Sequence, residues 1–181
     1  ISENTGKNTG GVFVAKDGTF IMDGANATIS GNRATSTSGG GIWTAGNTTF
    51  KNGTISSNGL PTAGESSENV TATAGGVYVA NNGTFTMEGG MISSNQGSTV
   101  GGVFVYNSSN SHFYMKGGSI FNNRGAAAGG AYVAGQMELT GGKITGNTAT
   151  SQVQTDGGSG IYIAGSGVVT MTGGEVSDNI G

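Results

Sequence analysis

The stretch from Gly75 to Asn95 reads GGVYVANNGTFTMEGGMISSN, and its order of residue types recurs along the whole chain. Two small residues lead into a short apolar segment. A turn leads into a second apolar segment, and a glycine turn leads to a third that ends in Asn. Residues 1–4, ISEN, match the end of another copy. Such a repeat predicts a solenoid. The five other copies occupy residues 10–32, 40–58, 101–123, 129–147 and 159–179.

The apolar residues of each copy alternate as the residues of a β-strand do. Val77 and Val79 flank Tyr78, and Met87 follows Phe85 by two positions. Side chains two apart in a strand point to the same face. Stacked copies would pair equivalent strands about 4.8 Å apart and would enclose the apolar columns. We therefore predict an all-β fold, a parallel β-helix with three short strands per turn and about six to seven turns. The third strands supply Ile1, Ile29, Ile55, Ile92, Ile120, Ile144 and Val176.

The copies differ in length mainly between the Asn and the next pair of small residues. The longest such segment, residues 59–74, reads GLPTAGESSENVTATA and holds the only proline, Pro61. An insertion at one corner of a coil leaves strand pairing intact. We expect one β-helix domain over residues 1–181, with an inserted loop at 59–74. Because neither end shows a polar cap, we also expect a longer array or end-to-end self-association.

The Asn that ends each copy forms the most regular column of the repeat. Asn tolerates the left-handed conformation that a tight corner needs. Its amide carries donors and acceptors, so stacked copies can bond to one another. We expect this ladder to be structural, with its side chains inside the coil. Its members are Asn4, Asn32, Asn58, Asn95, Asn123, Asn147 and Asn179.

Charged residues also follow the repeat. The position after the second apolar segment alternates in sign along the first four copies, and a further pair of opposite charges follows in the last two. Opposite charges on paired strands favour one register over others. We expect these residues on the outer surface, without a catalytic role. They are Asp23, Lys51, Glu88 and Lys116, with Lys143 and Glu175 as the further pair.

The composition excludes several classes of protein. Only 9% of residues are charged and the formal net charge is −3, so there is no basic patch for nucleic acid. No run approaches 18 apolar residues, so we expect no membrane insertion. Cysteine is absent, which excludes disulfides and thiolate metal sites.

An aromatic residue occupies the centre of each of the six first segments. If Val12 and Val14 point inward, Phe13 points outward beside Gly11 and Ala15. The column would then serve strand stacking, or form a contact strip for a glycan or a host-surface protein. A flipped strand that buries the rings is a third possibility. The residues are Phe13, Trp43, Tyr78, Phe104, Tyr132 and Tyr162.

The repeat GGVYVA…GTFTMEGGMISSN resembles the right-handed parallel β-helix repeats of large bacterial surface proteins. More loosely, it is similar to the GG-[VIA] and F-x-x-N motifs of chlamydial polymorphic outer-membrane proteins, with Phe121-Asn122-Asn123 as a partial match. The resemblance covers nearly the whole chain except residues 59–74. It implies right-handedness, which agrees with the crossover rule. It also implies a structural or adhesive segment of an extracellular, cell-surface or secreted protein.

Polysaccharide-degrading β-helix enzymes are the main rival class. They need carboxylates clustered on the outside of the coil, and the aspartates here lie at different positions of the repeat. His112 lies at a turn without an evident partner, and Arg33 and Arg124 follow the Asn corner onto the surface. We therefore expect no catalytic residues, no metal and no cofactor. The four aspartates are Asp17, Asp23, Asp156 and Asp178.

Two further surface patterns bear on function. A flat row of threonines would suggest ice binding, but bulk and charge interrupt the outer row of the second segments, Thr49, Thr86, Tyr114, Glu138 and Thr170. Asn-x-Ser/Thr motifs mark N-glycosylation acceptors in secreted proteins. In a chain this rich in Asn, Gly and Thr, we interpret them as products of composition. They begin at Asn26, Asn47, Asn52, Asn69, Asn82 and Asn107.

Overall fold

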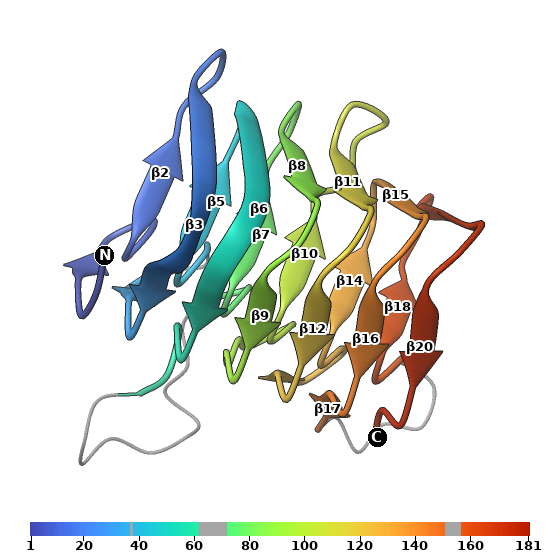
Figure 1. The fold of residues 1–181 in the computed structure, drawn as a ribbon. Coiled ribbons are helices and arrows are strands. Elements are labelled where there is room, and N and C mark those ends of the chain that lie inside the picture. The colour runs from blue at the N-terminus through green and yellow to red at the C-terminus, as the bar shows by residue number, and fades with distance from the viewer. Residues whose placement is uncertain (37, 62–71, 151–156) are drawn as a thin grey trace.

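A computed structural model describes residues 1–36, 38–61, 72–150 and 157–181. Its strands stack along one axis in chain order, so that the colour runs steadily from one end of the molecule to the other (Figure 1). Every pair of neighbouring strands is parallel. The predicted all-β parallel coil is confirmed.

The first strand of each coil belongs to one six-stranded sheet, which we call the aromatic sheet. Each strand has three residues, and the strand order is β18-β14-β10-β7-β5-β2. The strands are β2 (Val12–Val14), β5 (Ile42–Thr44), β7 (Val77–Val79), β10 (Val103–Val105), β14 (Ala131–Val133) and β18 (Ile161–Ile163).

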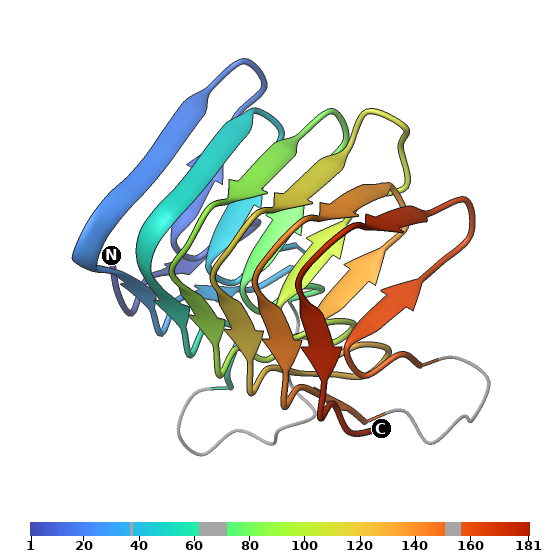
Figure 2. The same ribbon diagram turned by 45° about the vertical axis from the view of Figure 1, so that its right-hand side comes forward.

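The second and third strands form a ten-stranded sheet that bends around the other sides of the coil (Figure 2). In the first two coils these strands are continuous, as β3 (Thr19–Ser30) and β6 (Asn47–Ser56). The register between β3 and β6 shifts around Asp23. In the later coils they separate into β8 (Thr84–Met87) and β9 (Met91–Ser93), β11 (His112–Met115) and β12 (Ser119–Phe121), β15 (Gln136–Leu139) and β16 (Lys143–Thr145), and β19 (Val168–Met171) and β20 (Glu175–Ser177).

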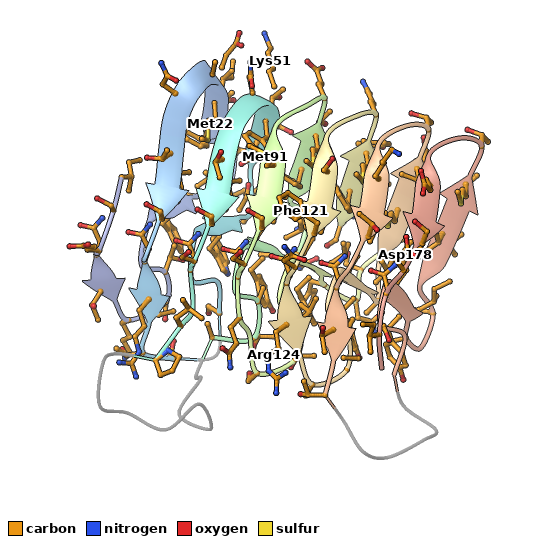
Figure 3. All side chains as sticks on the ribbon, turned by 60° about the horizontal axis from the view of Figure 1, so that its bottom comes forward. Met22, Lys51, Met91, Phe121, Arg124 and Asp178 are labelled. Carbon is orange, nitrogen blue, oxygen red and sulfur yellow. The ribbon has the colours of Figure 1, made fainter. Side chains whose placement is uncertain are left out.

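A fourth short segment follows the Asn corner in four coils, in addition to the three strands predicted per turn. These two-residue strands pair as β1 (Thr5–Gly6) with β4 (Arg33–Ala34), and as β13 (Arg124–Gly125) with β17 (Thr148–Ala149). Arg124 marks this lower edge in Figure 3. Gly59 and Ala74 lie at the same edge, since the Gly59 N–H donates to Asn32 O at 2.8 Å and Ala74 bridges Gly39 and Val100. Residues 62–71 of the expected loop lie outside the described residues.

The apolar columns fill the interior. Val77, Phe85 and Ile92, one from each strand of the third coil, are fully buried. Phe85 also stacks on Phe113 of the next coil, with ring centroids 5.4 Å apart. Fully burying such a side chain stabilises the fold by about 1.5–3 kcal/mol. The repeated burial of the same three columns is therefore the main force holding the coil closed.

The two small residues before each first strand face the Asn corner across the coil. A Cβ on Gly76 would lie 3.1 Å from Ile92 Cγ2 and 3.3 Å from Asn95 Nδ2. A Cβ on Gly75 would meet the backbone of Gln96, its nitrogen at 2.5 Å. The expectation that the second glycine lies beside the aromatic residue on the outer surface is therefore wrong. The glycine is needed because the third strand and the ladder pack directly against it.

The left-handed residue of the Asn corner is the residue before the ladder Asn. These residues have φ between 54° and 64°, whereas no ladder Asn has a positive φ. The expectation that Asn itself adopts the left-handed conformation is thus wrong. The chain changes direction at the residue before the Asn, so the Asn side chain points into the interior of the coil. The left-handed residues are Glu3, Gly31, Ser57, Ser94, Asn122, Gly146 and Asp178.

Two exposed ion pairs connect neighbouring coils. Lys51 Nζ lies 3.4 Å from Asp23 Oδ2, and Lys143 Nζ lies 2.8 Å from Glu175 Oε2. Lys51 projects from the upper edge of the molecule in Figure 3. Exposed pairs of this kind contribute about 0–1 kcal/mol. Their main effect is to favour this register of the strands.

Candidate functional site

The Asn ladder connects all the coils through one repeated contact. The Oδ1 of Asn95 accepts two hydrogen bonds from Asn58, one from the main-chain nitrogen and one from Nδ2, both at 3.0 Å. The Asn58 Nδ2 also donates to Ile29 O at 2.9 Å. Five ladder residues are buried, whereas Asn4 is exposed and Asn179 is half-buried. The buried members are Asn32, Asn58, Asn95, Asn123 and Asn147.

The aromatic column lies on the outside of the aromatic sheet. Val77 and Val79 are fully buried, and Tyr78 between them is half-buried. The same pattern holds in β10 and β14. The alternative in which the strand is flipped and the rings are buried is therefore wrong. The six residues are Cα partners along the sheet, in the order Phe13, Trp43, Tyr78, Phe104, Tyr132 and Tyr162.

The rings of the column stack along the axis of the coil in two groups, Phe13 with Trp43 and then Tyr78 through Tyr162. Phe13 and Trp43 are nearly parallel, with centroids 4.3 Å apart and planes at 2°. Phe104 stacks on both Tyr78 at 4.8 Å and Tyr132 at 5.1 Å. Tyr132 and Tyr162 are also 5.1 Å apart but tilted by 33°. From Tyr78 to Tyr162, where ring faces contact ring faces, the column presents mainly ring edges to its surroundings.

A row of three buried apolar residues, which we call the apolar ridge, packs against one side of this column in the third to fifth coils. Ala74, Val100 and Ala128 are buried, with Tyr78 and Phe104 among the rings packed against them. The equivalent residues of the first two coils are Thr9 and Gly39, and Phe13 there is 54% exposed. The ridge was not predicted from the sequence. Its only signal there is an apolar residue directly before the small pair in three copies.

Two tyrosines of the column titrate above the ordinary range. Burial raises the pKa of Tyr78, and the neighbouring Tyr106 raises it further. Burial also raises the pKa of Tyr132, with a smaller contribution from Tyr162. The desolvated phenol edge is harder to ionise because the phenolate loses water contacts.

His112 has a partner, contrary to the expectation from the sequence. It is the first residue of β11, and its Nδ1 lies 3.3 Å from the Tyr114 hydroxyl. The two rings are parallel, with planes at 1° and centroids 5.6 Å apart. Residues two apart in a strand share a face, which explains the contact.

The described carboxylates are spread over the coil. Asp17 lies in the turn after β2, Asp23 pairs with Lys51, and Asp178 precedes the last ladder Asn. Figure 3 shows Asp178 and Lys51 on different coils. Within the described ranges, no three His, Cys, Asp or Glu residues gather as metal ligands would. Asp156 lies outside the described residues.

The two outer faces of the large sheet are mixed in character. Along the second strands, Thr49 pairs with Thr86, Thr86 with Tyr114, and Tyr114 with Glu138. On the third strands, Met91 is 44% exposed, and Figure 3 shows it on the same side as Phe121. In the part of the chain that the structure describes, no helix is long and apolar enough to cross a bilayer.

The comparison with protein families identifies the fold class independently. The model of the right-handed β-helix region matches residues 1–176. The chain therefore belongs to this family, and the expected right-handed β-helix repeat region is confirmed. Searches of curated proteins and of solved structures each found no match.

Proposed function

We propose that this chain is a structural segment of an extracellular or cell-surface protein of a bacterium, where it acts as a rigid shaft and offers a contact surface. We also propose that the chain is not an enzyme and binds no cofactor. The observation that carries it is the unbroken ladder from Asn4 to Asn179, which bonds each coil to the next.

The physical support for a shaft is that each coil has the same contacts to both neighbours. The buried apolar columns, the Asn ladder and the parallel strands all run along the same axis. Bending the rod would have to disrupt the apolar columns, the Asn ladder and the strand pairing at the same time. A stack of this kind suits a protein that holds another part at a distance, since its stiffness does not depend on any single contact.

A second candidate function is adhesion through the aromatic column, with a glycan or a host-surface protein as partner. The column faces outward, and the strands of the aromatic sheet carry no charged residue. Aromatic side chains with a polar tip are common at contact surfaces. Because ring faces stack on one another from Tyr78 to Tyr162, a ligand over this part of the column would meet mainly ring edges. This geometry favours a flat protein surface over a sugar ring that needs a free aromatic face.

The shaft is tested by measuring one distance along it. The chain has no cysteine, so Thr19→Cys and Val168→Cys place spin labels on exposed positions of the first and last coils that the strand register connects. Five coil steps of about 4.8 Å predict a backbone separation of about 24 Å. We expect a narrow distance distribution that does not broaden in moderate urea. A broad distribution under native conditions would contradict the rigid shaft.

Adhesion is tested separately by titrating the chain with mucin, with an array of glycans and with host-surface extracts while following Trp43 fluorescence. Saturable binding that Tyr78→Ala and Tyr132→Ala abolish would establish the aromatic column as the contact surface. Thr86→Ala on the second-strand face serves as the control and should leave binding unchanged. Absence of binding, together with a narrow distance distribution, would leave the shaft as the function.

A further inference from the structure

The structure divides the asparagines of this chain into two groups. Seven of the 17 asparagines form the ladder, and none of these begins an Asn-x-Ser/Thr motif. The residue two positions after a ladder Asn is Gly, Ala or Leu. At Gly125 the reason is visible, since a Cβ there would already meet Val100 Cα at 2.5 Å. Packing therefore excludes a hydroxyl residue at Gly125, whereas Ala34, Leu60 and Ala149 already carry a side chain at the equivalent position.

The ten other asparagines behave differently. Six of them begin an Asn-x-Ser/Thr motif. Ser and Thr make up 42 of the 181 residues, so about two of ten positions would be followed by a hydroxyl two residues later. The motifs are therefore about three times as frequent among the non-ladder asparagines as composition alone gives. Over all 17 asparagines the composition gives about four such motifs against the six present, so the excess is confined to the non-ladder positions.

All the described acceptor asparagines are on the surface. Asn26, Asn47, Asn52, Asn82 and Asn107 are each exposed, and Asn69 lies outside the described residues. A transferase must reach the amide nitrogen of its acceptor, so exposure is the first requirement for modification. The five sites meet it without any change in the fold.

The sites are also grouped in space. Asn47 begins β6, Asn82 lies in the turn before β8, and Asn107 lies in the turn before β11. Because β6, β8 and β11 are consecutive neighbours in the sheet, these three asparagines follow one corner of the coil over three turns. Asn26 and Asn52 lie at the next corner of the first two coils, near the register shift of β3 and β6.

The amide oxygens of Asn82 and Asn107 each accept one hydrogen bond from another side chain. Asn110 Nδ2 donates to Asn82 Oδ1 at 3.2 Å, and Ser166 Oγ donates to Asn107 Oδ1 at 3.0 Å. Neither bond uses the amide nitrogen of Asn82 or Asn107 as donor. Asn82 also has a φ of 63°, which places it at the apex of its turn. Both sites lie in turns between strands, and these bonds leave their amide nitrogens open to a transferase.

We infer that this corner of the coil is a site of N-linked glycosylation, with Asn82 and Asn107 as its principal acceptors. The donor is a sugar activated as a nucleotide or lipid diphosphate, and a transferase supplies the catalysis. The amide nitrogen bonds to the anomeric carbon, the bond from that carbon to the phosphate oxygen breaks, and the nitrogen loses one proton. The diphosphate carrier leaves.

The modification goes beyond the shaft function and does not depend on adhesion. Sugars on this corner would project beside the second strands, whereas the ladder and the strand pairing lie inside and remain untouched. The added surface is polar and hydrated. It would raise solubility and protect the turns before β8 and β11 from proteases without altering the coil.

The decisive experiment is peptide mapping by mass spectrometry of the protein isolated from the organism that makes it. We expect whole-sugar mass increments on the peptides that contain Asn82 and Asn107. Unmodified peptides at both sites would overturn the inference.

A second experiment uses the folded, unmodified chain with a soluble N-glycosyltransferase and UDP-glucose. We expect transfer to Asn82 and Asn107, and loss of each signal in Thr84→Val and Ser109→Ala respectively. Leu60→Thr creates the motif Asn-Gly-Thr, the same as at Asn82, at the buried ladder residue Asn58. Asn58 should remain unmodified. Equal modification of Asn58 and Asn82, or no transfer while a control peptide is modified, would show that exposure at this corner does not define the site.

Discussion

The Oδ1 of Asn123 accepts both the main-chain N–H and the Nδ2–H of Asn95, each at 3.0 Å, inside the coil. The same Asn95 Nδ2 donates to Ile55 O at 3.0 Å. One side chain therefore joins its own coil to both the preceding and the following coil. Removing it would leave several buried polar groups without a partner.

Asn95→Ala is expected to destabilise the fold by about 3 kcal/mol or more, because each buried polar group left unpaired costs about 1–3 kcal/mol. The Asn58 N–H and the Asn123 Oδ1 would both lose a bond. Urea unfolding measures the change. The exposed Asn110→Ala is the control and should change the free energy of unfolding by less than about 0.5 kcal/mol. Equal effects of the two substitutions would contradict a structural ladder.

Gly76→Ala is expected to destabilise the coil by about 1–3 kcal/mol through overpacking. The added methyl group would lie 2.7 Å from Gly102 O and close to the Asn95 side chain. Gly165→Ala is the contrasting variant, since no atom lies within 4 Å of its Cβ and only its φ of 58° is unfavourable. The left-handed conformation costs about 1–2 kcal/mol. A double variant of Gly76→Ala with Asn95→Ala should lose less than the sum, because the two sites touch.

Ser94→Gly is expected to stabilise the protein. Ser94 is exposed and adopts a φ of 55°, a conformation that glycine adopts without steric cost. Relief of about 1–2 kcal/mol of strain exceeds the about 0.5–1 kcal/mol that glycine loses in backbone entropy. The reverse change at the equivalent position, Gly146→Ser, should lower the melting temperature. A lower melting temperature for Ser94→Gly would argue against strain at this corner.

Tyr78 is expected to ionise above its ordinary pKa of 10.0, because burial disfavours the phenolate. The folded state therefore favours the neutral phenol. The stability linked to Tyr78 is fully present below pH 10 and is lost as the pH rises through the higher pKa of the folded protein. Ultraviolet titration of phenolate absorbance should show a late component that Tyr78→Phe reduces and that Tyr78→Phe combined with Tyr132→Phe removes. A late component of unchanged size in Tyr78→Phe would contradict the raised pKa of Tyr78.

Several features of the fold followed directly from the printed sequence. The spacing of Val77, Val79, Phe85 and Met87 predicts strands and an interior, because side-chain alternation in a strand depends only on local geometry. The same alternation placed Tyr78 on the face opposite to Val77 and Val79 but left open which of the two faces is buried. The repeat itself implies stacking, since one copy has too little apolar surface to fold alone.

Other features required the stacked structure. Which residue of the Asn corner is left-handed could not be read from the sequence, because both Ser94 and Asn95 tolerate or prefer turns. The inward contact of Gly76 was also hidden, since it depends on the third strand crossing behind it. The partner of His112, Tyr114, lies only two residues away and could have been found from strand alternation.

The sequence by itself determined that this protein is a parallel β-helix, because a period repeated over six copies can bury its apolar residues only by stacking. Only the tertiary structure decided that the aromatic column faces outward and that the faces of neighbouring rings pack against one another. The packing of the rings depends on contacts between coils. Such contacts join residues some 24 to 37 positions apart, and no local pattern specifies them.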